Sequence, residues 1–179
     1  YLVVCVDGRG TNARGRDWRN ASYMNLGQME AEDQISVAKY LKTLPYVDGD
    51  RMAICGWSYG GYQTLMCLSK QQEMVWQCGI AIAPVTSWRL YDSAYTERYM
   101  RRPQVNEFGY RQADVINLAK DLKGSLLLVH GTADDNVHMQ HAWEYVDALV
   151  DAGKQFEMQF YPDDNHFLRN GNNYEHLHN

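Results

Sequence analysis

The residues Gly56-Trp57-Ser58-Tyr59-Gly60 carry the strongest fold signal in this chain. They follow the apolar run 52–55 and precede the helix-like run 62–68. A serine on a sharp turn between a buried strand and a helix holds its hydroxyl above the sheet, at the cost of a strained backbone. The flanking glycines, Gly56 and Gly60, are expected because a Cβ at either position would collide where the strand and the helix nearly touch. The stretch therefore predicts a nucleophile turn with Ser58 at its tip.

Apolar and helix-like segments alternate on both sides of this turn. We expect buried strands at 2–6, 52–55, 78–83, 126–130 and 156–161. Helices are expected at 30–41, 62–68, 88–99, 114–121 and 142–149, with a loop at 7–19. This alternation predicts an α/β fold with a mostly parallel sheet and helices on both faces. No repeat, low-complexity segment or linker interrupts the pattern.

The composition limits the classes of function. With 179 residues, 45% of them apolar and 22% charged, the chain is long enough for one globular domain with a core. The net charge of −5 provides no basic face, so nucleic acid is not an expected partner. The four cysteines have no metal-ligand spacing, and we interpret them as small buried hydrophobic residues, with disulfides as the less favoured alternative. They are Cys5, Cys55, Cys67 and Cys78.

Tyr1 leads directly into a predicted strand, with neither an initiator methionine nor a signal peptide before it. This beginning is typical of a piece of a longer polypeptide, and no conclusion on targeting follows from it.

Three polar residues each follow the carboxyl end of a predicted strand, namely Ser58, Asp134 and His166. Catalytic groups of parallel sheets gather at that edge. A serine hydroxyl needs a base, and histidine has an unperturbed pKa of about 6.5, which suits that role. His166 would take the Ser58 proton, and Asp134 would orient the imidazole. The backbone N–H of Tyr59 would stabilise the oxyanion, and the second donor is expected from a loop upstream of this chain.

Each of these assignments has an alternative. Ser58 could be only a helix N-cap. His166 competes with the other five histidines, of which His130 is interpreted as a strand-end or core residue. Asp134 competes with Asp135, and with the acidic pair at 163 and 164.

Several motifs together resemble one family. They are Asp7-Gly8-Arg9-Gly10, the segment 56–61, Ala83-Pro84-Val85, the segment 91–100 and the segment 130–138. They resemble the dipeptidyl peptidase IV branch of the prolyl oligopeptidase family of serine peptidases. The resemblance implies that 1–179 is part of an α/β-hydrolase catalytic domain, preceded by a β-propeller and by the first strands of the sheet. It also implies release of N-terminal Xaa-Pro or Xaa-Ala dipeptides through an acyl-enzyme, without a metal or other cofactor.

The resemblance also assigns a substrate pocket. It places Tyr59, Val85, Trp88, Tyr91, Tyr95 and Val137 around the substrate proline, and Arg98 and Asn136 beside the substrate backbone. Independently of the family, the spacing of Trp88, Tyr91 and Tyr95 predicts one helical face, and an aromatic slot suits the apolar ring of proline. The alternative interpretation is an aromatic stripe in the core.

The resemblance leaves other readings open. Relatives place paired glutamates for the substrate's ammonium group on the propeller, form homodimers, and work in the periplasm or at the cell surface. One departure is Phe167, which stands where relatives usually have glycine. The same fold also serves acylaminoacyl peptidases, prolyl endopeptidases and esterases. A catalytically dead interaction subunit is the alternative from another class.

Overall fold

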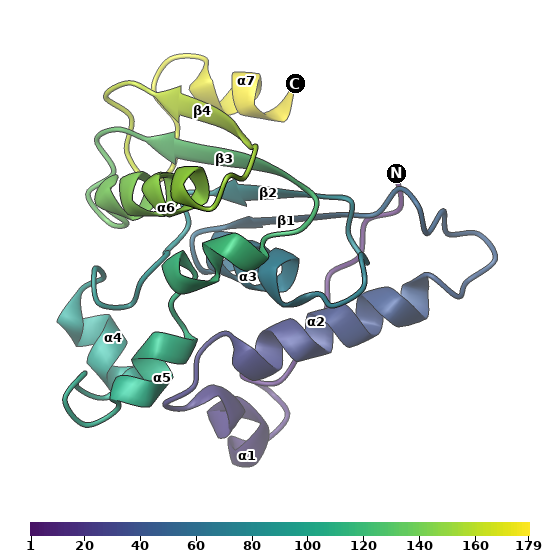
Figure 1. The fold of residues 1–179 in the computed structure, drawn as a ribbon, viewed down its shortest axis with the longest axis horizontal. Coiled ribbons are helices and arrows are strands. Elements are labelled where there is room, and N and C mark those ends of the chain that lie inside the picture. Colours follow the sequence, from purple (N-terminus) through teal and green to yellow (C-terminus); the bar gives the residue numbers. More distant parts are fainter.

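The computed structural model describes residues 1–179 and contains one four-stranded parallel sheet (Figure 1). The strands are β1 (Ala53–Trp57), β2 (Cys78–Ile82), β3 (Ser125–Gly131) and β4 (Glu157–Tyr161), and they lie in the spatial order β1-β2-β3-β4. Trp57 pairs with Ile82, and Ile82 pairs with Val129. Gly131, the last residue of β3, pairs with Tyr161, the last residue of β4. The carboxyl ends of all four strands therefore point the same way, and the loops that follow them meet at one edge of the sheet.

Helices connect and flank these strands (Figure 1). Helix α3 links β1 to β2, α6 links β3 to β4, and α2 lies against α3 on the side away from the sheet. The helical elements are α1 (Arg16–Arg19), η1 (Asn20–Ser22), α2 (Gln28–Leu41), α3 (Tyr59–Lys70), α4 (Ser93–Met100), α5 (Glu107–Gln112), η2 (Ile116–Asp121), α6 (Gln140–Asp151) and α7 (Asn173–His178). None of them has the length and apolar character needed to cross a bilayer.

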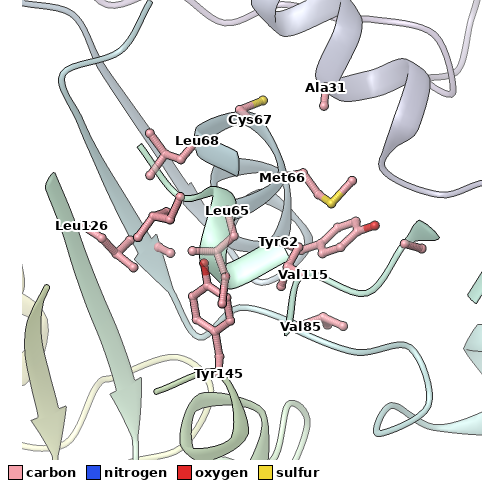
Figure 2. Packing of buried hydrophobic residues seen from close by; sticks show 14 of the residues in the cluster. Ala31, Tyr62, Leu65, Met66, Cys67, Leu68, Val85, Val115, Leu126 and Tyr145 are labelled. Carbon is pink, nitrogen blue, oxygen red and sulfur yellow. The ribbon is translucent and has the colours of Figure 1, made fainter. Parts of the chain in front are cut away.

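The main core fills the space between the sheet and helices α3 and α6. Figure 2 shows Leu65 of α3, Leu126 of β3 and Tyr145 of α6 gathered there, and each is at most 2% exposed. Side chains alternate across a strand, so Leu126 and Leu128 face this core while Val129 faces the opposite side. Complete burial of each leucine contributes about 1.5–3 kcal/mol. These contacts hold the helices to the sheet.

The opposite face of the sheet has a smaller core. Ile82, Val129 and Tyr161 pack there with Leu168, and Leu177 of α7 lies against them. Cys55 of β1 remains exposed on the same sheet. Helices thus lie on both faces, as the sequence predicts, but unequally.

Some sequence predictions are corrected by the structure. Residues 2–6 form no strand and 2–5 are exposed, because no described strand lies beside them to complete a ladder. The helix expected over 88–99 begins only at Ser93, where Asp92 Oδ1 accepts the Tyr95 N–H at 2.8 Å. The cap fixes the start of α4, since its carboxylate satisfies one of the free first-turn donors. The segment 114–121 is a 3₁₀ helix from Ile116.

The cysteine prediction holds only in part. All four thiols are free, and Cys67 is buried as expected, but Cys5 and Cys55 are exposed and Cys78 is half-buried. The two exposed thiols lie in the unpaired segment 2–6 and on the thinly covered face of β1. They are exposed because no helix packs over those positions.

The close crossing of β1 and α3 explains one of the two expected glycines. A Cβ on Gly56 would overlap the carbonyl oxygen of Gly60. A Cβ on Gly60, by contrast, would meet nothing within 4 Å, so the steric requirement expected there is wrong. The second crowded position is Gly61, whose Cβ would lie 2.8 Å from the Ile82 carbonyl oxygen. The strand therefore requires glycine before the serine, and the helix requires it three residues after.

This difference predicts that two alanine substitutions will have very different effects on stability. Gly56→Ala should lower the stability of this domain by about 3 kcal/mol or more, because backbone atoms cannot move aside as a flexible side chain can. Gly60→Ala should stay within about 1 kcal/mol of wild type, because alanine suits a helix better than glycine. Thermal unfolding of the two variants of the intact protein measures the difference. Equal transition temperatures would contradict the crowding at Gly56.

Candidate active site

Ser58 is the single residue that connects β1 to α3, and its backbone has a conformation that few serines adopt. Its φ is 60° and its ψ is −115°, and its N–H donates to the Ile82 carbonyl at 2.8 Å. Positive φ is strained for a residue with a side chain. Ser58 occupies the N-cap position of α3, but its side chain makes no capping hydrogen bond. The hydroxyl is thus not used for helix capping, which was the alternative role for this serine.

Tyr59 is the first residue of α3. The first N–H groups of a helix have no acceptor within the helix, and they carry its positive dipole end. The Tyr59 N–H is therefore placed directly after Ser58 with no intrahelical partner.

Asp134, in the loop after β3, contacts two backbone N–H groups and two imidazoles. Its Oδ1 accepts the N–H groups of Asn136 and Val137, both at 2.9 Å. Its Oδ2 lies 2.7 Å from His166 Nδ1 and 3.3 Å from His130 Nε2. The side chain is fully buried, whereas neighbouring Asp135 is exposed.

Burial by itself raises the pKa of Asp134. Hydrogen bonds from His130, His166 and the Asn136 N–H outweigh burial and hold the pKa below its usual value. The carboxylate therefore stays ionised at neutral pH. Because it accepts a hydrogen bond at His166 Nδ1, it favours the tautomer with the proton on that nitrogen and leaves Nε2 free to accept another.

His166 reaches the site from the loop after β4. It is 6% exposed, and its carbonyl oxygen accepts the indole N–H of Trp57 at 2.9 Å. Trp57 is the residue before Ser58, so this bond ties the nucleophile turn to the histidine loop. The structure thus joins Asp134 and His166 directly. It ties the His166 loop to the residue before Ser58, but no hydrogen bond links Ser58 to His166.

The other histidines have different surroundings. His141 is buried and accepts the Thr86 N–H at 3.0 Å, and its burial lowers its pKa to about 4. His176 contacts the Tyr161 hydroxyl, and His178 contacts the Tyr174 carbonyl. His138 is exposed before α6. None of them contacts Asp134.

His130 has a role that the sequence analysis missed. Its Nε2 donates to the Val137 carbonyl at 2.7 Å and approaches Asp134 Oδ2, while its buried Nδ1 has no partner. His130 is thus more than a strand-end residue, because it is a second imidazole against the same carboxylate. Its spacing of four residues from Asp134 was the available sequence signal.

Asp164 holds the histidine loop in shape. Its carboxylate accepts the N–H groups of Asn165, Arg169 and Asn170 and the Asn173 amide, at 2.8–3.2 Å. It is fully buried and contacts no imidazole. Asp164 is therefore an organiser of the loop, and the sequence alternative that it partners the base is not supported by these contacts.

The aromatic residues assigned to the pocket do come together. The rings of Trp88 and Tyr95 stack with centroids 5.9 Å apart, and Tyr91 lies 6.0 Å from Trp88 and 5.3 Å from Tyr95. A turn before α4 brings them together, rather than one helical face. Tyr91 and Tyr95 are half-buried, whereas Trp88 is 2% exposed and packs in the core behind them. Val85 and Val137 are also buried.

Two clefts border this aromatic group. One, of about 390 Å³, is lined by Tyr91, Asn136 and His138 among others. The other, of about 690 Å³, is lined by Glu30, Tyr59, Tyr95 and Arg98 among others. Asn136 and Arg98, both expected beside the substrate backbone, therefore line different clefts. The Tyr91 hydroxyl donates a hydrogen bond to Asn136 Oδ1 at 2.6 Å.

Glu30 is a further residue of the site that the sequence analysis did not identify. Its Oε1 accepts the Tyr59 hydroxyl at 2.7 Å, and its Oε2 is buried without a partner. Burial raises the pKa of Glu30, and the hydrogen bond from Tyr59 offsets only part of that rise. The carboxyl therefore holds the ring of Tyr59 from α2, at an electrostatic cost when it is ionised.

This raised pKa predicts a pH-dependent effect of Glu30→Gln. A carboxyl group whose pKa is higher in the folded than in the unfolded protein stabilises the fold in its protonated form. This stabilisation is complete below the unfolded-state pKa, which is about 4.3 for glutamate, and it is lost as the pH rises through the folded-state pKa. Glutamine keeps an acceptor for Tyr59 but does not titrate. The variant should thus gain stability relative to wild type as the pH rises from about 4 to neutral and above. Thermal unfolding of both proteins across this range tests it, and a constant difference would contradict it.

Comparisons with known proteins agree with this architecture. A model described as the prolyl oligopeptidase family matches residues 1–179. A crystal structure of Porphyromonas gingivalis dipeptidyl peptidase 4 superposes with a TM-score of 0.95 and 50% identity, over 97% of this chain and 25% of that one. Proteins named "Probable dipeptidyl-aminopeptidase B" from Aspergillus oryzae and Neurospora crassa are 49% and 48% identical over 168 and 176 residues.

The alignments cover 93% and 96% of this chain but only 19% of each fungal protein. The chain thus spans about a fifth of the length of these curated relatives. The sheet and its helices confirm the α/β-hydrolase fold that the sequence predicts. The resemblance noted in the sequence is likewise confirmed by the family match over all 179 residues and by the close structural likeness. This chain belongs to the prolyl oligopeptidase family of peptidases.

Proposed function

We propose that the intact protein containing this chain is a serine dipeptidyl peptidase, which releases Xaa-Pro or Xaa-Ala dipeptides from the free amino end of peptides. One observation carries the proposal: His166 contacts Asp134 at 2.7 Å while its carbonyl is tied to the residue before Ser58. The names of the relatives support the dipeptidyl specificity. The activity requires peptide substrates and no cofactor.

In the first half-reaction, the Ser58 Oγ attacks the carbonyl carbon of the peptide bond and His166 Nε2 accepts its proton. The ionised Asp134 stabilises the imidazolium through the Nδ1–H. The Tyr59 N–H donates to the oxyanion of the tetrahedral intermediate. The C–N bond then breaks, the leaving amine takes the proton from His166, and the dipeptide remains as an ester of Ser58.

In the second half-reaction, water attacks this ester. His166 removes a proton from the water and returns it to Ser58 Oγ as the ester bond breaks, which releases the dipeptide acid. Two loops must keep their positions through both halves. The contacts of Asp134 hold the loop after β3, and those of Asp164 hold the loop after β4.

The aromatic group beside α3 suits the substrate proline. Tyr59, Tyr91 and Tyr95 expose part of their rings, and Trp88 supports them from the core. Rigid apolar walls fit a proline ring, which has no N–H that needs an acceptor. Alanine would fill the same space less completely.

Other features of the intact protein remain predictions from the family resemblance. They are recognition of the substrate's ammonium group by paired glutamates, homodimer formation, and a location in the periplasm or at the cell surface. The alternatives with the same fold are an acylaminoacyl peptidase, a prolyl endopeptidase or an esterase.

Replacement of Ser58 tests the nucleophile. Ser58→Ala in the intact protein should lower kcat by roughly a million-fold, as in a subtilisin whose serine is removed. A fluorophosphonate probe should label the wild type at Ser58 and leave the variant unlabelled. Ser36→Ala, in which an exposed serine of α2 is replaced, is the matched control and should keep full activity. A loss of only tenfold would rule out Ser58 as the nucleophile. The absence of an adduct on wild type would instead favour the interaction-subunit alternative.

A free amino group is the discriminating requirement of an exopeptidase. The intact protein should cleave Gly-Pro-4-nitroanilide and leave its N-acetylated form essentially uncleaved. The comparison is made at equal substrate concentration by absorbance of released nitroaniline. Preference for the acetylated substrate would replace the proposal with an acylaminoacyl peptidase or a prolyl endopeptidase.

A further inference from the structure

An exposed aromatic side chain lies beside the catalytic imidazole. Phe167 follows His166 directly, its ring centroid is 5.8 Å from that of the imidazole, and the two rings meet edge to face at 72°. Phe167 is 60% exposed, although both of its neighbours are buried. An apolar ring thus remains in solvent directly beside the imidazole of His166.

The loop holds Phe167 at that position. His166 is 6% exposed and Leu168 is fully buried, so both sides of Phe167 are anchored in the protein. The Phe167 N–H donates to Asn165 Oδ1 at 2.9 Å, and the Asp164 carboxylate binds the backbone on either side. The outward direction of the ring is therefore set by the loop, and a substrate would meet it with little loss of conformational entropy.

A cation borders the ring. The Arg169 guanidinium lies 5.7 Å from the centroid of Phe167 and 6.0 Å from that of Tyr174. Arg169 forms none of the ion pairs of this structure. Stacking of a guanidinium between two rings restricts both of them. Phe167, Arg169 and Tyr174 thus form a small platform beside His166.

The chemistry of the proposed reaction identifies what reaches this platform. His166 must give its proton to the amine of the departing peptide, so the first residue after the cleaved bond lies against the imidazole. Its side chain then lies near the ring next to that imidazole. Apolar side chains gain from contact with an exposed aromatic ring, because both surfaces leave water.

We propose that Phe167, supported by Arg169, determines specificity on the leaving-group side and favours an apolar or aromatic residue directly after the cleaved bond. This inference rests on the proposed dipeptidyl peptidase activity. It concerns the part of the substrate that the proline pocket does not contact. The expected preference is roughly three- to tenfold in kcat/KM, the range of one aromatic packing contact.

The test compares two amidated peptides, Gly-Pro-Phe-Ala-NH2 and Gly-Pro-Gly-Ala-NH2, with the intact protein. The parameter kcat/KM reports acyl-enzyme formation, during which the leaving group is still attached. Wild type should prefer the phenylalanine peptide roughly three- to tenfold, and Phe167→Ala should reduce the ratio to about one. Phe167→Leu should retain part of the preference. Titration of Ser58 with a fluorophosphonate probe corrects each rate for the fraction of folded, reactive protein.

The chain offers a matched control. Phe108 of α5 is also exposed, with the Arg111 guanidinium 5.9 Å from its ring, but it is outside the site. Phe108→Ala should leave the ratio unchanged. An equal rate for both peptides in wild type, or an unchanged ratio in Phe167→Ala, would overturn the inference while Gly-Pro-4-nitroanilide is still cleaved. Failure to cleave any Gly-Pro substrate would instead overturn the proposed function.

Discussion

The close crossing of β1 and α3 at Gly56 is the constraint on which the site depends. The absence of a side chain lets the strand pass against the Gly60 carbonyl, and Ser58 must then turn with a positive φ. This turn places the first N–H of α3 beside the serine hydroxyl. The strain at one residue is tolerated because β1 and α3 are fixed on either side by the sheet and the main core. Packing of β1 against α3 thus fixes the conformation of Ser58, the proposed nucleophile.

A second constraint is electrostatic and joins separate loops. Asp134 is buried, yet its two carboxylate oxygens receive two backbone N–H groups and face two imidazoles. A buried carboxylate is stable only when its charge is compensated in this way. The same contacts fix His166 from the β4 loop and His130 from the end of β3. The orientation of His166, the proposed base, is therefore set by contacts with residues at the carboxyl edge of the sheet.

Local patterns were sufficient for much of the fold. Four of the five expected strands form, and the glycine-flanked serine turn stands where the sequence places it. The failures share a cause. Residues 2–6 have the apolar pattern of a strand, but a strand also needs a neighbour. The early part of 88–99 has helical spacing, but the Asp92 cap delays the helix. In each case the secondary structure was decided by a contact or a helix cap that the spacing of apolar residues does not reveal.

The candidate site likewise has residues that the sequence predicts and residues that only the structure reveals. Residue type and position after a strand were enough to predict Ser58, Asp134 and His166, because parallel strands bring their carboxyl ends to one edge. Trp57 and Glu30 contribute through hydrogen bonds to residues that are 109 and 29 positions away in the sequence. His130 contributes because its side chain is buried against Asp134 at the end of β3. By itself, the sequence determined the order of elements and the chemistry available at the sheet edge. Only the tertiary structure decided which buried side chains hold those groups in place, because packing and hydrogen bonding between distant segments leave no fixed spacing along the chain.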